Sequence, residues 1–310
     1  MQVFRGIPER SDSGCVLTIG NFDGVHRGHQ ALLAKLSAKA KALGLPAAVL
    51  TFEPHPREYF AHEARPRRLT SLREKIELLR AQGVDRLYIG RFNAQLAGLT
   101  ADQFIERVLR QGLDVRHLMI GDDFRFGQGR KGDFALLQKA GAAQGFGVEA
   151  MDTLVHEGER VSSSAVRQAL AAGEMEHAAR LLGRPYSISG RVMHGDKIGR
   201  TIGFPTCNIQ LKHRSPPMMG IYTVSVEGLA EHPWPGVASI GVRPTINDAG
   251  RTTLEVHLFD WSAECYDAHL KVNFLAKQRD EARYDTLEAL TAQIARDADE
   301  ARAYFVRNPF

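Results

Sequence analysis

The chain has 310 residues, of which 44% are hydrophobic and 25% are charged, and its 40 basic and 36 acidic side chains give a formal net charge of +4. This mixture is typical of a folded globular protein and excludes a disordered chain and an integral membrane protein. Because 310 residues exceed a typical single core, two domains are predicted.

The cysteines and the N-terminal segment bear on the cellular compartment. Cys15, Cys207 and Cys265 are far apart and have no paired metal-ligand spacing, which suggests neither a disulfide framework nor a zinc site. The N-terminal segment lacks the apolar stretch of a signal peptide, and no apolar run approaches the roughly 20 residues that cross a bilayer. We therefore expect a cytoplasmic protein without a membrane partner.

Basic residues are scattered along the chain, although its isoelectric point is near 9.0. The densest group, Arg65, Arg67 and Arg68 with Arg73 nearby, can meet a phosphate-bearing ligand or simply form a solvated loop. No basic stripe interleaved with aromatic residues is found, so no nucleic-acid partner is expected.

The first half alternates short apolar, β-branched runs with helical patterns. Strands are predicted at 15–20, 47–52, 86–90 and 117–121, a helix at 29–44, and two short helices within 162–183. Such alternation predicts a parallel sheet covered on both faces. Capping boxes indicate helix starts at Ser71 with Glu74 and Thr100 with Gln103, and the matching helix ends are Gly44, Gly83 and Gly112.

After Gly183 the pattern changes to short strands separated by Gly and Pro, which predicts a small antiparallel β-barrel. The chain then closes with an amphipathic helix, expected to begin at Asp285 and to pack against the barrel. The predicted domains are therefore residues 1–183 and 184–310.

A glycine-rich segment, GNFDGVHRGH, joins the first predicted strand to the first helix, the edge at which open parallel sheets bind ligands. Two histidines three residues apart can bind a metal or be structural, but the glycine context favours a nucleotide-phosphate site. Gly20, Gly24 and Gly28 would let the backbone come close to a phosphate. His26 and His29 would donate hydrogen bonds to its oxygens.

The HRGH sequence fits the HxGH pattern of nucleotidyltransferases, whose histidines stabilise charge at the α-phosphate. Three further segments strengthen the match: TFEPHPRE (51–58), GDDFRFGQGRKGD (121–133) and VSSSAVRQAL (161–170). Together they resemble the adenylyltransferase domain of the bacterial bifunctional riboflavin kinase/FAD synthetase family. The resemblance covers nearly all of the first half and implies a Rossmann-like α/β nucleotidyltransferase fold that transfers AMP from ATP to FMN, forming FAD.

The resemblance also implies roles for individual residues, with His26 and His29 as the catalytic pair. The ATP and its phosphates would be bound by Gly20, Asn21, Asp23, Gly24, His26, His29, Asp123, Arg125, Ser162, Ser163, Ser164 and Arg167. The flavin nucleotide would be bordered by Phe52, Pro54 and His55. Phe124 would lie beside the nucleotide, Phe126 is either core or site, and the serine run is either a phosphate site or a helix cap.

A second glycine-rich loop, HGDKIGRTIGFPTCN (194–208), can offer backbone N–H groups to phosphates but is not a Walker loop, and its glycine spacing alone favours a plain β-turn. Thr206 and Asn208 are two residues apart, so on a strand both face one side, where a hydroxyl and an amide oxygen suit Mg²⁺. Glu255 should face the same polar side as His257 and is a candidate general base for a primary hydroxyl, or else an ordinary exposed strand residue.

With GIYTVSV, SIGVRPT and KQRDEARYDTLEAL, these residues resemble the riboflavin kinase barrel of the same family. The resemblance implies that Glu255 removes the proton from the ribityl 5′-hydroxyl of riboflavin, that Thr206 and Asn208 bind Mg²⁺, and that Arg279 lies near the flavin. The ATP phosphates would be flanked by Gly195, Lys197, Gly199, Arg200 and Thr206.

The sequence departs from the family pattern at several positions: Ser164 stands where Thr is usual, Cys207 where Ala is, Ser239 where Asn is, Asp267 where Gly is, and Gln278 where Leu is. None removes a presumed catalytic group. The predicted function is therefore phosphorylation of riboflavin to FMN and adenylylation of FMN to FAD, both with MgATP. The alternatives are an enzyme with one degenerate domain and a flavin-sensing regulator that binds nucleic acid.

Overall fold

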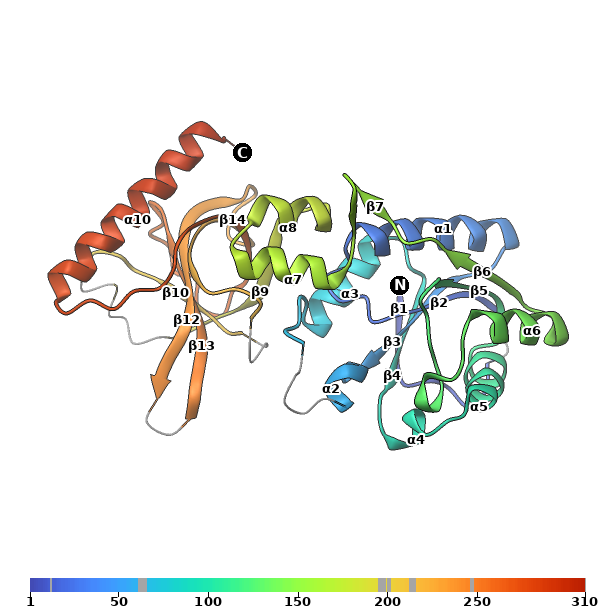
Figure 1. The fold of residues 1–310 in the computed structure, drawn as a ribbon. Helices are drawn as coiled ribbons and strands as arrows, with labels where there is room; N and C mark the ends of the chain where they lie inside the picture. The colour runs from blue at the N-terminus through green and yellow to red at the C-terminus, as the bar shows by residue number, and fades with distance from the viewer. Residues whose placement is uncertain are drawn as a thin grey trace. The chain divides into compact units, whose positions relative to one another are not determined.

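The computed structural model of the protein describes residues 1–11, 13–60, 66–194, 199, 202–211, 216–245 and 248–309, with backbone only for 242–245 and 248–251. By their internal contacts these residues form two compact units. The first unit is Met1–Pro66 with Leu72–Ser162, and the second is Arg67–Ser71 with Ser163–Phe310. Figure 1 labels their helices and strands.

The first unit is built on a six-stranded sheet in which every neighbouring pair is parallel. Its strand order is β1-β4-β3-β2-β5-β6, with β1 Gln2–Arg5, β2 Cys15–Ile19, β3 Ala47–Glu53, β4 Arg86–Arg91, β5 Val115–Gly121 and β6 Gly147–Met151. The predicted parallel sheet is confirmed. Strands β1 and β6 were not predicted; β1 lies at the sheet edge with all four residues exposed, so it carries no buried pattern.

Helical segments cover both faces of this sheet (Figure 1). They are α1 Arg27–Leu43, α2 Pro56–Phe60, α3 Leu72–Ala81, α4 Ala94–Ala97, α5 Ala101–Gln103, a π-helical stretch Phe104–Gly112, a 3-10 turn Gln128–Arg130 and α6 Phe134–Gln144; a hairpin of β7 Val155–His156 and β8 Glu159–Arg160 follows. Successive side chains of β2 point to opposite faces of the sheet, so each face has its own hydrophobic core. Leu17 packs with the π-helical stretch and α6 on one face, whereas Val16 packs with α1 and α3 on the other.

Most predicted helix ends agree with the structure. Thr100 and Gln103 form the expected capping box, and Gly44 ends α1 in the left-handed conformation. Gly112 is different, because it is the last helical residue and Leu113 is the cap. A Cβ at Gly112 would lie 2.8 Å from the carbonyl oxygen of Pro8, so close backbone approach explains this glycine.

The second unit contains a closed antiparallel barrel, as predicted. Its strand order is β10-β13-β12-β11-β14-β9, with β9 Tyr186–Met193, β10 Cys207–Ile209, β11 Gly220–Glu227, β12 Trp234–Thr245, β13 Asp248–Leu258 and β14 His269–Arg279. Helix α10 Leu287–Arg307 lies along the outside of β11 and β12 (Figure 1). Its expected start at Asp285 is wrong by one residue, since the hydroxyl of Thr286 accepts the N–H of Ala289 at 3.1 Å.

Two short helices, α7 Ser163–Ala172 and α8 Met175–Leu182, precede the barrel, and α8 packs on β14 and β9. By contacts both helices belong to the second unit, although the predicted domain boundary follows Gly183. None of the described helices combines the length and the apolar character needed to cross a membrane.

Candidate active sites

The strand order of the first unit creates a switch point between β2 and β5. From β2 the chain winds through β3 to β4 on one side, and β5 and β6 then lie on the other side. Ligands of open parallel sheets bind at the carboxyl ends of strands at such a point. The segment that starts at Gly20 follows β2, and the segment that starts at Asp122 follows β5. The fold therefore brings two of the predicted motifs to one sheet edge.

His26 is the N-cap of α1. Its backbone is extended, and its ring Nδ1 accepts the backbone N–H of His29 at 3.4 Å. An accepting Nδ1 carries no proton, so the neutral His26 ring has its proton on Nε2. The ring that carries this N–H stands at a helix N-terminus, where anions are favoured.

His29 is half-buried and stacks on His26, with the two ring centroids 3.7 Å apart. Burial, followed by the neighbouring His26 and Lys75, holds the pKa of His29 well below its usual 6.5, so the ring is neutral at physiological pH. The buried His29 Nδ1 and Asn21 Oδ1 have no hydrogen-bond partner among the described residues. Since buried polar atoms are normally paired, both fit a ligand that binds at this edge.

The loop between β2 and α1 is held in an unusual shape. Phe22 and Val25 have φ angles of 48° and 41°, which non-glycine residues rarely adopt and which cost about 1–3 kcal/mol each. Thr51 donates its hydroxyl hydrogen to the Asn21 carbonyl at 3.3 Å, and Gln30 donates to the Val25 carbonyl at 2.9 Å. Such strain is retained where surrounding contacts fix a functional loop.

Glycines and acidic residues complete this loop. Gly24 has a φ of 82°, and Asp23 is 4% exposed. A Cβ on Gly28 would lie 3.2 Å from the His26 ring and 3.6 Å from the Val161 carbonyl oxygen. The chain just before Ser162 therefore lies close to the HRGH segment, as the predicted site requires.

The predicted flavin border lies at the end of β3. Phe52 is half-buried and packs edge-on against Phe92 with centroids 5.8 Å apart. Pro54 is exposed, and half-buried His55 accepts the N–H of Arg57 at 3.0 Å through its Nδ1. Sequence analysis missed Phe92, which also contacts both aromatic residues of α2, because an isolated aromatic residue after a strand has no recognisable pattern.

The segment after β5 divides into surface and core residues. Asp123 pairs with Arg160 at 2.8 Å, and Arg125 donates to the Phe124 carbonyl at 2.9 Å. Phe126 is 6% exposed and belongs to the sheet core, which agrees with the first of the two interpretations given for it. Of the serine motif, Ser162 lies in the first unit, whereas Ser163, Ser164 and Arg167 belong to the second, so their role in adenylyl transfer stays a prediction.

In the barrel, five residues on five neighbouring strands form one cross-strand row. Asn208 is opposite Glu255, Glu255 is opposite Ser239, Ser239 is opposite Ile221, and Ile221 is opposite Arg279. Directly opposed residues share a face of the sheet. The neighbours of Glu255 along β13, Leu254 and Val256, are fully buried, so the row lies on the outer face of the barrel.

Four of these five residues line a cavity of about 340 Å³ on that outer face. Apolar side chains from β11, β12 and α10 make up much of its wall, and polar side chains come from the row and from the segment after β14. The lining residues are Gly199, Ile202, Phe204, Thr206, Ile221, Val237, Ser239, Glu255, His257, Arg279, Glu281, Ala282, Tyr284, Leu290, Ile294 and Asp297. A largely apolar pocket with a few converging polar groups is the usual form of a small-molecule site.

The predicted metal-binding pair meets this row from β10. Thr206, one residue before β10, lines the cavity, and Asn208 stands opposite Glu255. His257 Nδ1 donates to the Pro205 carbonyl at 2.8 Å, which fixes the start of β10 against β13. Two oxygen donors beside a carboxylate fit a hard cation such as Mg²⁺.

Arg279 forms a two-point ion pair with Asp297 of α10, with N···O distances of 2.9 and 2.6 Å. The hydrogen bonds to Asp297 raise the pKa of Arg279, which stays charged. Gln278 donates to the Thr223 hydroxyl and to the Asp297 carbonyl. The wall beside the predicted flavin residue is thus anchored to α10.

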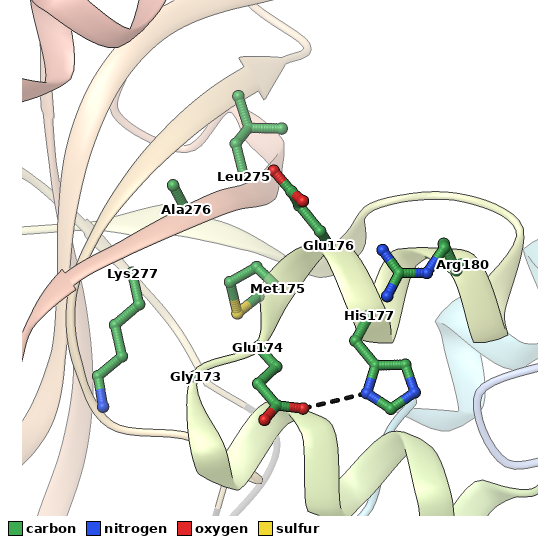
Figure 2. Close-up of a pocket in the computed structure, with 9 residues that line it drawn as sticks. All are labelled: Gly173, Glu174, Met175, Glu176, His177, Arg180, Leu275, Ala276 and Lys277. Atoms are coloured by element: carbon green, nitrogen blue, oxygen red, sulfur yellow. Dashed lines mark hydrogen bonds and ion pairs between the residues drawn. The ribbon is translucent and has the colours of Figure 1, made fainter.

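A separate hollow in the second unit lies where α8 meets β14 (Figure 2). Within it Glu174 hydrogen-bonds His177 at 3.0 Å, and Lys277 of its wall pairs with Asp280, which does not line the hollow, at 2.6 Å. No predicted site residue lines this hollow, whose walls carry both signs of charge.

Comparison with known proteins decides the family. Residues 8–165 match the sequence model of FAD synthetase, and residues 182–305 match that of riboflavin kinase. The chain belongs to the bifunctional riboflavin kinase/FMN adenylyltransferase family. Such an enzyme from Escherichia coli K12 is 52% identical over 309 residues, which cover 98% of this chain and 98% of the relative. One from Pseudomonas fluorescens is 51% identical over 307 residues, which cover 98% of this chain and 97% of the relative.

The whole fold also matches a solved structure. A Streptococcus pneumoniae protein described as a macrolide-efflux protein superposes with a TM-score of 0.83 over 99% of both chains, at 29% identity. The family match assigns riboflavin kinase and FMN adenylyltransferase activities to this chain, with ATP and flavins as substrates.

The structure describes the surroundings of one glycine of the kinase motif, Gly199, and of one position that departs from the family pattern, Asp267. Gly195, Lys197 and Arg200 lie outside the described residues, whereas Gly199 lines the barrel cavity and accepts the Phe204 N–H at 2.8 Å. Asp267 has a φ of 62°, the region that favours Gly, so the side chain here costs about 1–2 kcal/mol.

Sequence analysis missed two charged residues that lie at the two candidate sites. Lys75 on α3 is 5% exposed and contributes positive potential at His29, and Asp297 on α10 is 4% exposed and holds Arg279. A charged residue at a buried position of an amphipathic helix is the signal that would have found both.

Proposed function

We propose that the two activities reside at two separate sites, with riboflavin phosphorylated at the barrel cavity and FMN adenylylated at the β2–β5 edge of the sheet. The barrel assignment is supported by the row that runs from Asn208 through Glu255 to Arg279, because all its residues except Asn208 line one cavity. The sheet assignment is supported by two buried, unpartnered atoms, Asn21 Oδ1 and His29 Nδ1, beside a helix N-terminus.

In the barrel, Glu255 accepts the proton of the ribityl 5′-hydroxyl while that oxygen attacks the γ-phosphorus of ATP, and ADP leaves. A positioned general base typically contributes about 10²–10⁴-fold to the rate. The remaining catalysis comes from holding the hydroxyl and the phosphate in line. The apolar wall formed by Ile221, Val237, Leu290 and Ile294 suits the flavin ring, with Arg279 at its polar end.

The donor set of the barrel fits Mg²⁺. Thr206 supplies a hydroxyl oxygen and Asn208 an amide oxygen, and Glu255 on the adjacent strand provides negative charge nearby. Mg²⁺ bound to Thr206 and Asn208 would neutralise charge on the ATP phosphates. The two residues would also orient those phosphates toward Glu255.

At the sheet edge, a phosphate oxygen of FMN attacks the α-phosphorus of ATP, and pyrophosphate leaves. His26 and His29 donate N–H groups to the oxygens on which negative charge develops, and the N-terminus of α1 adds a favourable field. Because the His29 ring is neutral, it needs its one proton on the nitrogen that faces the phosphate. Asp23, Asp123, Arg125 and Ser162, all in the first unit, would complete the nucleotide site.

Two incubations test both assignments, one with riboflavin and MgATP and one with FMN and MgATP. Purified protein with riboflavin and MgATP should form FMN and then FAD, which chromatography separates. FMN without FAD would contradict the adenylyl-transfer site, and FAD formed only from supplied FMN would contradict the kinase site. Either result would favour a single-activity enzyme with one degenerate domain.

A further inference from the structure

Two thiols that are far apart in the sequence meet beside the barrel cavity. The sulfur atoms of Cys207 and Cys265 are 2.8 Å apart, although 58 residues separate them. Both cysteines are free and half-buried. A disulfide bond has an S–S length of about 2.05 Å, so only a small closure separates these thiols from a crosslink.

The two cysteines belong to elements with different roles. Cys207 is the first residue of β10, between Thr206 and Asn208. Cys265 lies in the connection between β13 and β14, where its carbonyl accepts the N–H of Ala268 at 3.2 Å. A bond between their sulfurs would join the strand of the proposed metal ligands to a connection outside the cavity wall.

We propose that Cys207 and Cys265 form a reversible disulfide when the protein meets a small-molecule disulfide, and that this crosslink lowers riboflavin phosphorylation and spares FMN adenylylation. The first part depends only on the two thiols. The second part rests on the proposed division of the two activities between the units. Disulfides in reducing compartments are usually transient and redox-sensing, which fits such a pair.

The exchange proceeds in two balanced steps. One protein sulfur attacks the small disulfide, forms a mixed disulfide and releases one small-molecule thiol. The second protein sulfur then attacks the mixed disulfide, forms the Cys207–Cys265 bond and releases the second thiol. Two electrons pass from the protein to the small disulfide, and the two protein thiol protons end on the released thiols.

Coupling to the kinase follows from the geometry of β10. Successive side chains of a strand alternate, so Cys207 points to the opposite face from Thr206 and Asn208. The crosslink therefore leaves the cavity open but pulls the backbone that carries both oxygen donors. A misplacement of about 1 Å in a positioned group can cost about 100-fold in rate, so a tenfold or greater loss is expected.

Cys15 provides an internal control. It is fully buried in β2 of the first unit, and its thiol donates to the Leu113 carbonyl at 3.3 Å. It should keep its thiol in the folded protein throughout.

The test equilibrates the full-length protein in glutathione buffers of rising oxidised fraction. Thiols are then blocked and mapped by mass spectrometry, and both activities are measured in the same samples. We expect the Cys207 and Cys265 peptides to appear as one crosslinked species, with about a tenfold lower rate of riboflavin phosphorylation and an unchanged rate of FAD synthesis from FMN. Dithiothreitol should restore the kinase rate. Cys265→Ser should have the same kinase rate as the reduced wild type, and this rate should not fall in oxidised glutathione. Cys207→Ala should also fail to crosslink.

Three outcomes would overturn the proposal: both thiols remaining alkylatable in fully oxidising buffer, a disulfide forming between two chains, or the crosslink forming without a change in kinase rate. Failure of the proposed function can be told apart from failure of the disulfide proposal before any oxidation. In that case the fully reduced protein would already lack one of the two activities.

Discussion

Asn208 on β10 stands directly opposite Glu255 on β13 in the antiparallel ladder. The two side chains therefore share one face, and Ser239 extends the same row on the other side of Glu255. Neighbouring strands therefore hold an amide oxygen that can bind a cation next to a carboxylate that can accept a proton. This arrangement supports the proposed kinase role of Glu255, which an isolated exposed glutamate would lack.

Glu255→Gln should lower riboflavin phosphorylation by about 10²–10⁴-fold, because the amide cannot accept the hydroxyl proton. FAD synthesis from supplied FMN should be unchanged. Glu227→Gln is the matched control, since Glu227 is also a strand glutamate but pairs with Lys271 away from the cavity. Phosphorylation near the wild-type rate in Glu255→Gln would remove Glu255 from its proposed role.

His29→Ala should lower FAD synthesis about 10²–10³-fold, which is the usual cost of removing a donor that stabilises charge in the transition state. Riboflavin phosphorylation should stay near the wild-type rate. His156→Ala, in the β7–β8 hairpin of the same unit, is the control and should retain both activities. A comparable fall of both activities in His29→Ala, with a lower melting temperature, would indicate a folding role instead.

Asp297→Asn should raise the KM for riboflavin, because Arg279 loses the charged half of its two-point pair at the cavity wall. Loss of hydrogen bonds to a charged group costs about 2 kcal/mol. Asp260→Asn is a close control: Asp260 also forms a two-point pair with an arginine of α10, Arg302, but does not line the cavity. Equal KM changes in the two variants would mean that general anchoring of α10 matters, rather than the contact at Arg279.

The core thiol of Cys15 predicts an alkaline dependence of stability. Burial raises the pKa of Cys15 from 9.0 to about 12. Between these values the unfolded chain loses the proton that the native chain keeps, so the free energy of unfolding falls as pH rises. Between pH 8 and 10 the wild type should lose about 1.4 kcal/mol more than Cys15→Ala in denaturant titrations. The same pH dependence in both proteins would contradict this.

The sequence predicted what periodicity and local chemistry determine. Alternation placed Glu255 and His257 on one face of a strand, and Thr100 with Gln103 formed the capping box that their spacing indicated. The prediction that Asp285 begins α10 was wrong by one residue. Asp and Thr both favour the N-cap position, and only the backbone conformation shows that Thr286 occupies it.

Other relationships arise only from tertiary packing. Asp297 meets Arg279 because α10 packs on the barrel, and no local pattern encodes that contact. Cys207 and Cys265 offered no recognisable spacing, yet barrel closure brings their sulfurs together. Pairs so distant along the chain are determined by the fold as a whole.

The final prediction concerns the boundary between the catalytic halves. A fragment of residues 1–183 should convert FMN to FAD and ignore riboflavin, and 184–310 should do the reverse. However, α8 packs on β14 and β9, and Met175, Leu181 and Leu182 of α8 are buried. Cutting after Gly183 removes this cover from the barrel.

A fragment of residues 163–310 should therefore be more stable than 184–310, with the same riboflavin kinase activity. Burial of one such apolar side chain stabilises by about 1.5–3 kcal/mol at most, so a difference of several kcal/mol is expected. Thermal unfolding of the two fragments measures it, and kinase assays below both melting temperatures show whether the site is intact. Equal melting temperatures would mean that α7 and α8 contribute no stability to the barrel, and the cut after Gly183 would then separate independent domains.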